Sequence, residues 1–366
     1  MARFLPLFPF HPIQEIRRDT SLPSAARPLF RDYLWGGRKL QTVLGKTLPA
    51  NGVWAESWEI VDHPEHSSAI LNGPLADNTL HQVCEADPKW LLGDQPQEKE
   101  SSGGSDNRET NPRTLPLLLK YLDCQRVLSV QVHPDDHYGQ QMLPPDLGKT
   151  EAWYIIAAEP ESVLYAGLKL GVTREDLQAA LAAGEVEQCL HRIHPQAGDC
   201  VFIPAGTVHA LGAGLLVAEI QQASNTTFRL FDWNRLDADG QPRALHVEQS
   251  LEVIDFASGP RRLQVAQPIE QLPSGQVVRE RLVECNKFLL DRLRAAQEDA
   301  VTLQLGGDGR CHLVTVPVGQ ATLSWGDASS HSEQLATGQS ILLPAALSAV
   351  SVQLEPGTTL LDMRVP

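Results

Sequence analysis

Three short polar segments, each beside a run of residues with strand character, constrain this chain more than any other feature. They are residues 131–134 (Gln-Val-His-Pro), 148–151 (Gly-Lys-Thr-Glu) and 204–209 (Pro-Ala-Gly-Thr-Val-His). Gln131 and His133 alternate within one apolar run, so both side chains leave the same face of a strand. If they converge with Glu151 and His209 inside a small β-barrel, an amide, two imidazoles and a carboxylate form a metal site with room for a water or a substrate oxygen.

The acidic composition argues against two classes of partner. The 366 residues carry a net charge of −15, with an isoelectric point near 5.2. Nucleic acids and anionic membranes bind clustered positive charge, so we expect neither as a partner.

The apolar run at residues 4–10 is short and contains two prolines, which does not fit a signal peptide or a membrane span, and we expect a cytoplasmic protein. The six cysteines are scattered without a paired motif and are expected to be reduced thiols.

The length and the turn pattern indicate two domains. We expect an N-terminal extension over residues 1–27, regular structure from about Pro28, a first domain ending at residue 259, and a second domain over residues 260–366. Short apolar runs between Gly, Pro, Asn and Asp turns predict strands in both domains. Residues 95–113 are rich in charge, Ser and Gly, and predict a flexible surface loop.

One stretch, residues 173–192, has a helical pattern. Thr173 followed by Asp176 is a helix-capping pair, and Gly184 is expected to divide the stretch into two short helices. The apolar stripe consists of Leu177, Leu181, Val186 and Leu190.

An internal repeat links the two halves of the chain. Residues 198–205 (Gly-Asp-Cys-Val-Phe-Ile-Pro-Ala) correspond to residues 338–345 (Gly-Gln-Ser-Ile-Leu-Leu-Pro-Ala). The first copy continues to His209, whereas the second continues into Ala-Leu-Ser-Ala-Val without a metal ligand. The repeat predicts two β-barrels of one lineage, with metal chemistry in the first alone.

The residues by themselves leave the ligand set open. Gln131 is an unusual ligand, because a neutral amide oxygen binds Zn²⁺ less strongly than imidazole or carboxylate, and it could instead be a buried hydrogen-bonding residue. His133, Asp135 and His209 would also suit a two-histidine, one-carboxylate iron site. Against that triad, Pro134 tends to turn the chain and carry Asp135 away from the face that His133 occupies.

Cationic residues accompany the proposed pocket. Lys149 lies two residues before Glu151, so the two side chains share a side if the chain is extended. Arg229 and Arg235 are six residues apart and share a face if their segment is a strand. Three cations near a metal pocket in an acidic protein suggest an anionic substrate.

Several motifs, in matching order from about Pro28 to Phe256, resemble those of type I mannose-6-phosphate isomerases, which are zinc enzymes of the cupin superfamily. The motifs are Tyr33-Leu-Trp-Gly-Gly, Glu56-Ser-Trp-Glu-Ile, Leu128-Ser-Val-Gln-Val-His-Pro-Asp-Asp, Gly148-Lys-Thr-Glu, Pro204-Ala-Gly-Thr-Val-His-Ala-Leu and Thr227-Phe-Arg. The similarity continues less distinctly through the C-terminal part.

The resemblance implies a mainly β fold of two cupin-like (jelly-roll) barrels with a short helical insert in the first. It implies interconversion of mannose 6-phosphate and fructose 6-phosphate through an enediol(ate) intermediate, with one Zn²⁺ per chain. The residue roles that it implies are zinc ligation by Gln131, His133, Glu151 and His209, catalysis by Arg229 and Lys149, and phosphate binding by Ser129 and Arg235.

The chain departs from the longer family members in one respect. Only 57 residues separate Glu151 from His209, where longer members insert a helical domain, so the chain resembles the short bacterial form. The missing insert leaves the strictness of the substrate preference open. The alternative functions are a cupin Fe(II) oxygenase using His133, Asp135 and His209, or a noncatalytic sugar-binding cupin. The expected partner is a small sugar phosphate, and the expected state is a monomer, with a dimer as the alternative.

Overall fold

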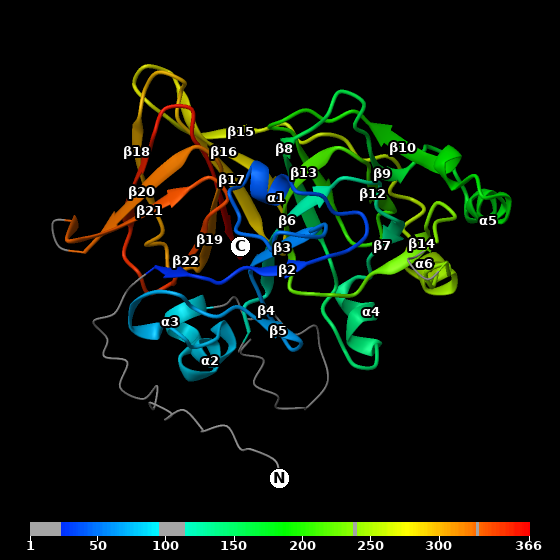
Figure 1. The fold of residues 1–366 in the computed structure, drawn as a ribbon, viewed down its shortest axis with the longest axis horizontal. Coiled ribbons are helices and arrows are strands. Elements are labelled where there is room, and N and C mark those ends of the chain that lie inside the picture. Colours follow the sequence, from blue (N-terminus) through cyan, green and yellow to red (C-terminus); the bar gives the residue numbers. More distant parts are fainter. Residues whose placement is uncertain (1–22, 95–113, 237–239, 327–328) are drawn as a thin grey trace, which may run out of the picture.

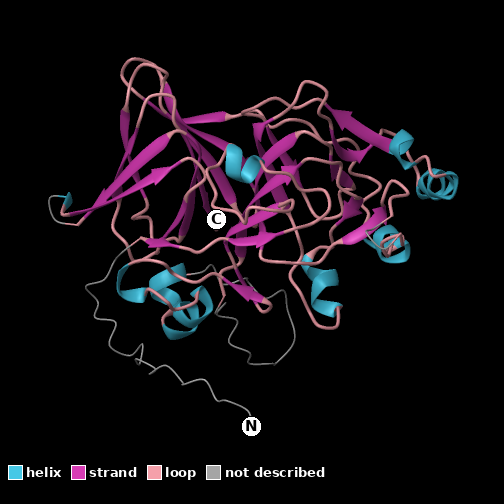
Figure 2. Ribbon diagram, viewed as in Figure 1, coloured by secondary structure: helices cyan, strands magenta, loops and turns pink. Residues whose placement is uncertain are grey.

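The protein consists of two β-barrels that lie side by side (Figure 1). The structure, a computed structural model, describes residues 23–94, 114–236, 240–326 and 329–366. Strands form most of both barrels, and the helices lie at the periphery (Figure 2). The mainly β, cupin-type fold expected from the sequence is confirmed.

The first barrel is built from two antiparallel sheets. The larger sheet has the strand order β11 (Cys200–Ile203), β8 (Glu151–Ala157), β13 (Leu215–Gln222), β6 (Leu117–Cys124), β3 (Glu56–Ile60) and β2 (Leu29–Arg31). The smaller sheet has the order β10 (Leu190–Ile193), β9 (Leu164–Leu168), β12 (His209–Leu211), β7 (Val130–Val132) and β14 (Phe228–Phe231).

The second barrel repeats the plan of the first. Its larger sheet has the order β1 (Ser24–Ala25), β22 (Ser340–Leu343), β19 (His312–Val318), β24 (Thr359–Arg364), β17 (Leu289–Arg294), β16 (Val277–Glu284) and β15 (Gln267–Gln271). The smaller sheet has the order β18 (Val301–Leu305), β23 (Val350–Leu354), β20 (Gln320–Trp325) and β21 (His331–Ala336). A two-stranded ribbon, β4 (Asp62–His63) and β5 (His66–Ser67), projects from the first half of the chain.

The repeated sequence occupies equivalent places in the two barrels. It forms β11 in one and β22 in the other, and each of these strands begins after a glycine with positive φ, Gly198 (94°) and Gly338 (82°). Glycine suits these positions because other residues adopt positive φ at a cost. Counted from these strands, the orders β11-β8-β13-β6-β3-β2 and β22-β19-β24-β17-β16-β15 match strand for strand.

The helices are short. They are α1 (Lys39–Thr42), α2 (Leu80–Ala86), α3 (Pro88–Leu92), α4 (Asp136–Gln141), α5 (Arg174–Ala183) and α6 (Val247–Val253), with 3-10 turns η2 (Gly73–Leu75) and η3 (Val186–Cys189). In the part of the chain that the structure describes, no α-helix follows α6, and no helix has the length and apolar character needed to cross a bilayer. All six cysteines are free thiols, as expected.

The predicted helical insert is confirmed in its first part and wrong at its end. Thr173 caps α5 in a capping box with Asp176, and Gly184 ends the helix with a left-handed conformation (φ 72°). The expected second helix is a short 3-10 turn, and Leu190 lies on β10, which pairs with β9. The four apolar residues of the predicted stripe therefore lie on three elements: Leu177 and Leu181 on α5, Val186 on η3, and Leu190 on β10. Regular structure also begins earlier than Pro28, at β1; the expected loop at 95–113 and the run at 4–10 lie outside the described residues.

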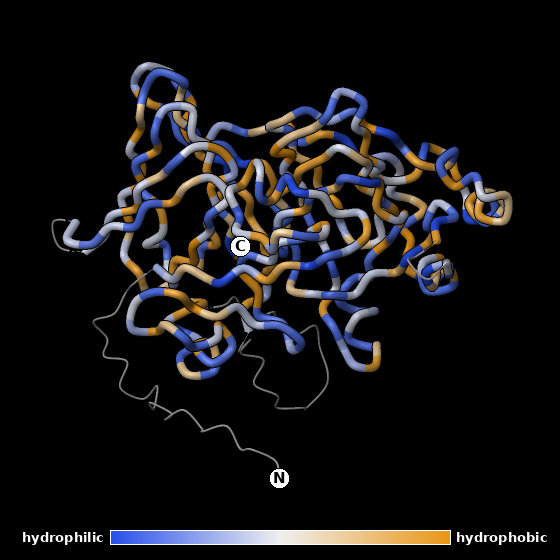
Figure 3. The backbone as a smooth tube through the Cα atoms, viewed as in Figure 1, coloured by the Kyte–Doolittle hydropathy of each residue, from blue (hydrophilic) through white to orange (hydrophobic). Residues whose placement is uncertain are grey.

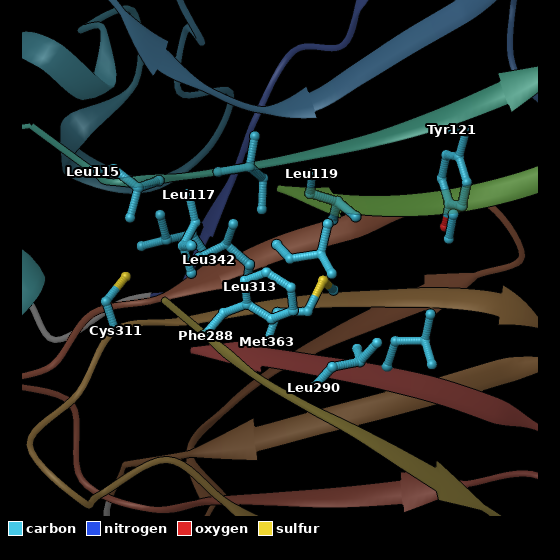
Figure 4. Packing of buried hydrophobic residues seen from close by; sticks show 14 of the residues in the cluster. Leu115, Leu117, Leu119, Tyr121, Phe288, Leu290, Cys311, Leu313, Leu342 and Met363 are labelled. Carbon is cyan, nitrogen blue, oxygen red and sulfur yellow. The ribbon is translucent and has the colours of Figure 1, made fainter. Parts of the chain in front are cut away.

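The two barrels pack through the outer faces of their larger sheets. Leu119 of β6 belongs to one buried cluster with Leu313 of β19 and Met363 of β24, in which Phe288 is also fully buried (Figure 4). The Tyr121 hydroxyl of β6 is hydrogen-bonded to Thr315 of β19 across the same interface. Burial of each large apolar side chain contributes about 1.5–3 kcal/mol, so this shared core joins the barrels firmly.

The inner face of the larger sheet in the first barrel changes character along its strands. Ile155 and Trp153 of β8 belong to an apolar cluster inside the barrel, whereas Glu151 on the same face is a buried carboxylate. In the same way Leu122 of β6 is followed on its face by the buried Lys120. Hydrophobic and hydrophilic residues both occur along the strands of the two barrels (Figure 3). One end of the first barrel is thus apolar inside, and the other end is polar.

Candidate metal centre

The three polar sequence segments meet at the polar end of the first barrel. Gln131 lies on β7 directly opposite His209 on β12 in the antiparallel register, and Glu151 is the first residue of β8. Val130 and Val132, the neighbours of Gln131 on β7, point the other way and belong to the apolar cluster that includes Leu251 of α6. The alternation of the strand therefore directs Gln131 and His133 into the barrel, as the sequence predicted.

Two imidazoles and one carboxylate face each other in this space. His133 Nε2 lies 3.5 Å from Glu151 Oε2, and His209 Nε2 lies 3.4 Å from Glu151 Oε1. All three side chains are 0–1% exposed. Among the described residues, they form the group whose nitrogen and oxygen atoms are spaced closely enough to bind one metal ion.

Backbone carbonyl groups fix the orientation of both imidazoles. His133 Nδ1 lies 3.0 Å from the Thr226 carbonyl oxygen, and His209 Nδ1 lies 2.9 Å from the Thr207 carbonyl oxygen. A neutral imidazole that donates its Nδ1–H to a carbonyl presents the lone pair of Nε2 on its other side. Both lone pairs therefore point toward Glu151, in the arrangement that metal-binding histidines adopt.

The spacing of these atoms is close enough for one ion to contact all three side chains, because one ligand atom from each lies within 4.8 Å of the others. Ligand atoms about 2.0–2.1 Å from a tetrahedral ion lie about 3.3–3.4 Å from each other. His133 Nε2 and Glu151 Oε1 are buried without a hydrogen-bond partner in the described structure, whereas Glu151 Oε2 lies 3.3 Å from Lys149 Nζ. Unpaired buried polar atoms are costly, and a cation between His133 and Glu151 would satisfy both of them.

Gln131 completes the group on the fourth side. Its amide Nε2 lies 3.2 Å from His209 Nε2. The amide nitrogen and oxygen exchange places by a half-turn of the side chain, and that rotation directs the carbonyl oxygen toward the same point. The donor set is then two nitrogens and two oxygen-bearing groups, which suits a borderline ion.

Burial keeps the two histidines in the metal-binding form. Burial, and next the charge of Lys149, lowers the pKa of His133 well below its ordinary value. Burial also lowers the pKa of His209, to about 4. Burial and the neighbouring Glu219 raise the pKa of Glu151. The imidazoles are therefore neutral near pH 7, and a cation at this point would stabilise the carboxylate.

Two of the predicted cationic residues adjoin the group. Lys149 is buried, and its Nζ lies 3.3 Å from Glu151 Oε2. Arg229 is opposite Gln131 in the β14–β7 register, so both side chains leave the same face of the small sheet. Its Nη1 donates to the Ala244 carbonyl, while its Nε is buried without a partner in the described structure. Burial, and next the charge of Arg243, lowers the pKa of Arg229.

The residues that the resemblance placed at the phosphate lie farther along the same strands. Ser129 is buried two residues before Gln131. Arg235 follows β14 and donates to the Asp232 carboxylate and to the Val127 carbonyl. The two residues therefore sit beyond the end of the β7–β14 ladder that carries Gln131 and Arg229.

Sequence reasoning missed a row of buried charges beneath the metal centre. Lys120 Nζ lies 3.2 Å from Glu219 Oε1 and 3.8 Å from Glu56 Oε2, and Trp153 Nε1 donates to Glu219 Oε2 at 2.9 Å. Burial alone would lower the pKa of Lys120, but the carboxylates of Glu56 and Glu219 outweigh burial and raise this pKa. The clue was present, because Lys120 and Glu219 each interrupt an apolar strand sequence. Their pairing depends on the β6–β13 register, which joins residues far apart in the chain.

The alternative iron triad is not assembled. Asp135 is exposed and serves as the N-cap of α4, where its Oδ1 accepts a hydrogen bond from the Tyr138 amide at 2.9 Å. Pro134 turns the chain between β7 and α4, as its effect on the backbone predicts. The set His133, Asp135 and His209 was therefore wrong as a ligand group.

The second barrel has a different arrangement at the equivalent end. Glu151 pairs with Ile203 on β11, and the equivalent pair in the second barrel is His312 with Leu343 on β22. His312 Nδ1 lies 2.7 Å from Asp362 Oδ1, and its Nε2 lies 2.9 Å from Asp308 Oδ1. Both ring nitrogens are thus occupied by carboxylates.

The fold and the site define a cupin-type double barrel with a candidate metal centre in one barrel. The model of the family "Phosphomannose isomerase type I, catalytic domain" matches residues 26–161. The mannose-6-phosphate isomerase ManA of Bacillus subtilis is 36% identical over 270 residues, which cover 74% of this chain and 78% of the relative. The probable mannose-6-phosphate isomerase GmuF of the same organism is 40% identical over 232 residues, covering 63% of this chain and 68% of the relative.

Solved structures agree with the sequence comparisons. The crystal structure of the mannose 6-phosphate isomerase from Bacillus subtilis matches with a TM-score of 0.78 and 27% identity, covering 93% of this chain and 99% of that chain. A putative mannosephosphate isomerase from Archaeoglobus fulgidus has the same fold, with a TM-score of 0.69 and 20% identity over 94% of this chain and 97% of that chain. The chain belongs to the type I phosphomannose isomerase family.

Proposed function

We propose that the protein is a zinc-dependent aldose–ketose isomerase that interconverts mannose 6-phosphate and fructose 6-phosphate. Family membership supports the reaction class, since relatives that cover most of the chain are named mannose-6-phosphate isomerases. The observation that carries the proposal is the buried group of His133, Glu151 and His209, with unpaired polar atoms directed at one point.

In this proposal Gln131, His133, Glu151 and His209 hold one Zn²⁺. Nitrogen and carboxylate ligands suit zinc, and a site with three strong ligands and one weak amide leaves room for a substrate oxygen. When bound, Zn²⁺ would supply Lewis acidity at the oxygens of the sugar.

The reaction moves a carbonyl group between C1 and C2 of the sugar. A proton leaves one carbon and another proton is delivered to its neighbour, through an enediol(ate) in which negative charge develops on oxygen. Arg229 is always protonated and lies on the same face as Gln131, so it can donate to that developing charge. Such a contact stabilises the transition state more than the ground state, because the charge is absent from the bound sugar.

Lys149 and the phosphate residues have the remaining roles. Lys149 is buried beside Glu151, with its Nζ 3.3 Å from Oε2, and is our candidate for proton transfer beside the metal. Ser129 and Arg235, at the far end of the same ladder, are proposed to help hold the phosphate, which would orient the open-chain sugar toward the metal centre.

The two barrels are proposed to have different roles, catalysis in the first and structural support in the second. Residues 28–259 would form the catalytic unit, and β1 before it pairs with β22 of the second barrel. Residues 260–366 would form a metal-free barrel that supports the catalytic unit through the shared core.

A coupled assay with metal removal tests the proposal. Purified protein is assayed for fructose 6-phosphate formed from mannose 6-phosphate, then after chelation, and again after Zn²⁺ is restored. We expect activity to be lost on chelation and to return with Zn²⁺. Failure of the untreated protein to form fructose 6-phosphate would overturn the isomerase, and oxygen consumption with Fe(II) and 2-oxoglutarate would favour the oxygenase instead.

A further inference from the structure

A short segment between β13 and β14, formed by Ser224, Asn225 and Thr226, adjoins the metal centre. The carbonyl oxygen of Thr226 lies 3.0 Å from His133 Nδ1 and fixes the orientation of that imidazole. Thr226 belongs to neither strand, so the β-ladders do not by themselves place its carbonyl. Whatever holds the 224–226 segment therefore also holds one of the candidate metal ligands.

One carboxylate, that of Asp146, holds all three residues of the segment. Its Oδ2 accepts from Thr226 Oγ1 at 2.6 Å and from Ser224 Oγ at 2.9 Å. The same oxygen accepts from the Asn225 amide at 3.2 Å. A single side chain from a distant part of the sequence therefore contacts the whole segment.

The charge of Asp146 fixes the direction of these hydrogen bonds. Burial alone would raise the pKa of Asp146, but the neighbouring His63 and the hydroxyls of Thr226 and Ser224 outweigh burial and lower this pKa. An ionised carboxylate can only accept hydrogen bonds, so both hydroxyl groups must donate to it. Charge-assisted bonds are shorter and stronger than neutral ones, which agrees with the 2.6 Å distance to Thr226.

Asp146 is itself held against α4. Its amide donates to the Gly139 carbonyl at 3.1 Å, and its Oδ1 accepts from the Leu147 amide at 2.8 Å. A Cβ atom at Gly139 would lie 2.5 Å from the Asp146 carbonyl oxygen, so the backbone of Asp146 lies directly on the helix. The carboxylate therefore has a fixed position relative to α4, the helix that follows His133 in the chain.

The polar groups of Thr226 connect the carboxylate to the metal centre. The hydroxyl donates to Asp146, the amide donates to Ser224 Oγ at 3.3 Å, and the carbonyl accepts from His133 Nδ1. A rotation of the segment would disturb these bonds together. The contacts therefore form a continuous series from Asp146 through Thr226 to His133.

We propose that Asp146 is a positioning residue for the metal centre: it holds the 224–226 segment so that the Thr226 carbonyl keeps His133 Nε2 directed at the metal ion. The binding of zinc at this centre rests on the proposed function. Loss of a partner that orients a metal-binding histidine typically lowers metal affinity by about 10- to 100-fold. Asp146 acts one hydrogen bond farther out, so we expect an effect of about 10-fold, at the lower end of that range.

Zinc titration of Asp146→Ala tests the proposal, with Asp176→Ala as the matched control. The Asp176 carboxylate also accepts from a threonine hydroxyl and a backbone amide, both at 2.9 Å, but it does so at the start of α5. We expect the dissociation constant of Zn²⁺, measured by competition with a chromophoric chelator, to rise about 10-fold in Asp146→Ala. It should be unchanged in Asp176→Ala.

Thr226→Val is a milder variant that keeps the backbone carbonyl. Thr226 is partly exposed, and valine keeps the branched shape while removing the hydroxyl that donates to Asp146. We expect a smaller loss of zinc affinity than in Asp146→Ala, and no further loss when the two substitutions are combined, because both act through one contact. Additive losses in the double variant would contradict the series of contacts.

The metal-free protein gives a second readout at His133 itself. Long-range ¹H–¹⁵N NMR, with the resonance assigned by His133→Gln, reports which ring nitrogen carries the proton. We expect the Nδ1–H tautomer in the wild type and in Asp176→Ala, and a mixture of tautomers in Asp146→Ala.

Neither readout depends on turnover, which separates this proposal from the isomerase assignment. Unchanged zinc affinity and an unchanged His133 tautomer in Asp146→Ala would overturn the positioning role, even if the wild-type protein is an isomerase. Changes in both support the role, even if the wild-type protein fails to form fructose 6-phosphate.

Discussion

A buried ion pair between the barrels offers a sharp test of the packing described above. Lys46 Nζ lies 2.6 Å from Glu59 Oε2, and the two side chains are 9% and 2% exposed. Ser340 of the second barrel also donates to Glu59 Oε2, at 3.1 Å. We predict that Lys46→Met strongly destabilises the protein, because Glu59 is left as a buried charge without a counter-charge.

The magnitude follows from burial. Removing one partner of a buried pair typically costs about 3–5 kcal/mol. The bond from Ser340 does not replace the lost charge, so we expect a value in this range. The double variant Lys46→Met/Glu59→Gln removes both charges and should recover most of the loss, which gives a coupling energy of about 2 kcal/mol or more.

The assay is urea denaturation followed by circular dichroism, with a matched exposed pair as control. Lys89 and Asp94 form an ion pair at 3.0 Å with side chains 76% and 82% exposed. Lys89→Met should change the free energy of unfolding by no more than about 1 kcal/mol, because exposed pairs contribute little. If Lys46→Met and Lys89→Met reduced the free energy of unfolding equally, the reasoning that burial determines the destabilisation would be refuted.

Three further predictions concern activity, pH and packing. Arg229→Ala should lower kcat by about 10²-fold or more while the bound metal is kept, as loss of one transition-state donor does, and normal turnover would contradict its role. Burial alone would lower the pKa of His312, but the carboxylates of Asp362 and Asp308 raise this pKa from 6.5 to about 9. Its stabilising contribution is therefore present below about pH 6.5 and lost as the pH rises through about 9, so His312→Gln should destabilise the protein more at about pH 6 than at about pH 10, as measured by urea denaturation. Leu313→Ala, in the fully buried core between the barrels, should reduce the free energy of unfolding by about 2–5 kcal/mol, and a loss below about 1 kcal/mol would argue against that core.

Local sequence pattern predicted the elements that depend on neighbouring residues. Alternation in residues 128–133 placed Gln131 and His133 on one face, and Thr173 with Asp176 fixed the start of α5. Pro134 correctly argued against Asp135 as a ligand, because its effect on the preceding residue is local.

Features that depend on the pairing of distant strands were harder to predict from the sequence. Leu190 fitted a helical stripe, but its pairing with β9 made it a strand residue. Lys120 and Glu219 meet through a register between residues 99 positions apart in the chain. Arg243 reaches Asp232 after a loop, so nothing in the sequence around Arg243 indicated this contact. The equivalence of β11 and β22 was a long-range relation that the sequence did predict, because residues 198–205 and 338–345 have similar sequences.

Anomalous X-ray diffraction at the zinc absorption edge tests the central claim most directly. The protein is crystallised with Zn²⁺, and the wild type is compared with His209→Ala. We predict one strong peak per chain, about 2.0–2.2 Å from His133 Nε2, His209 Nε2, a Glu151 oxygen and the Gln131 amide oxygen, and a peak that is lost or much weaker in the variant. A wild-type peak at His312 alone, or full occupancy in His209→Ala, would contradict the metal centre.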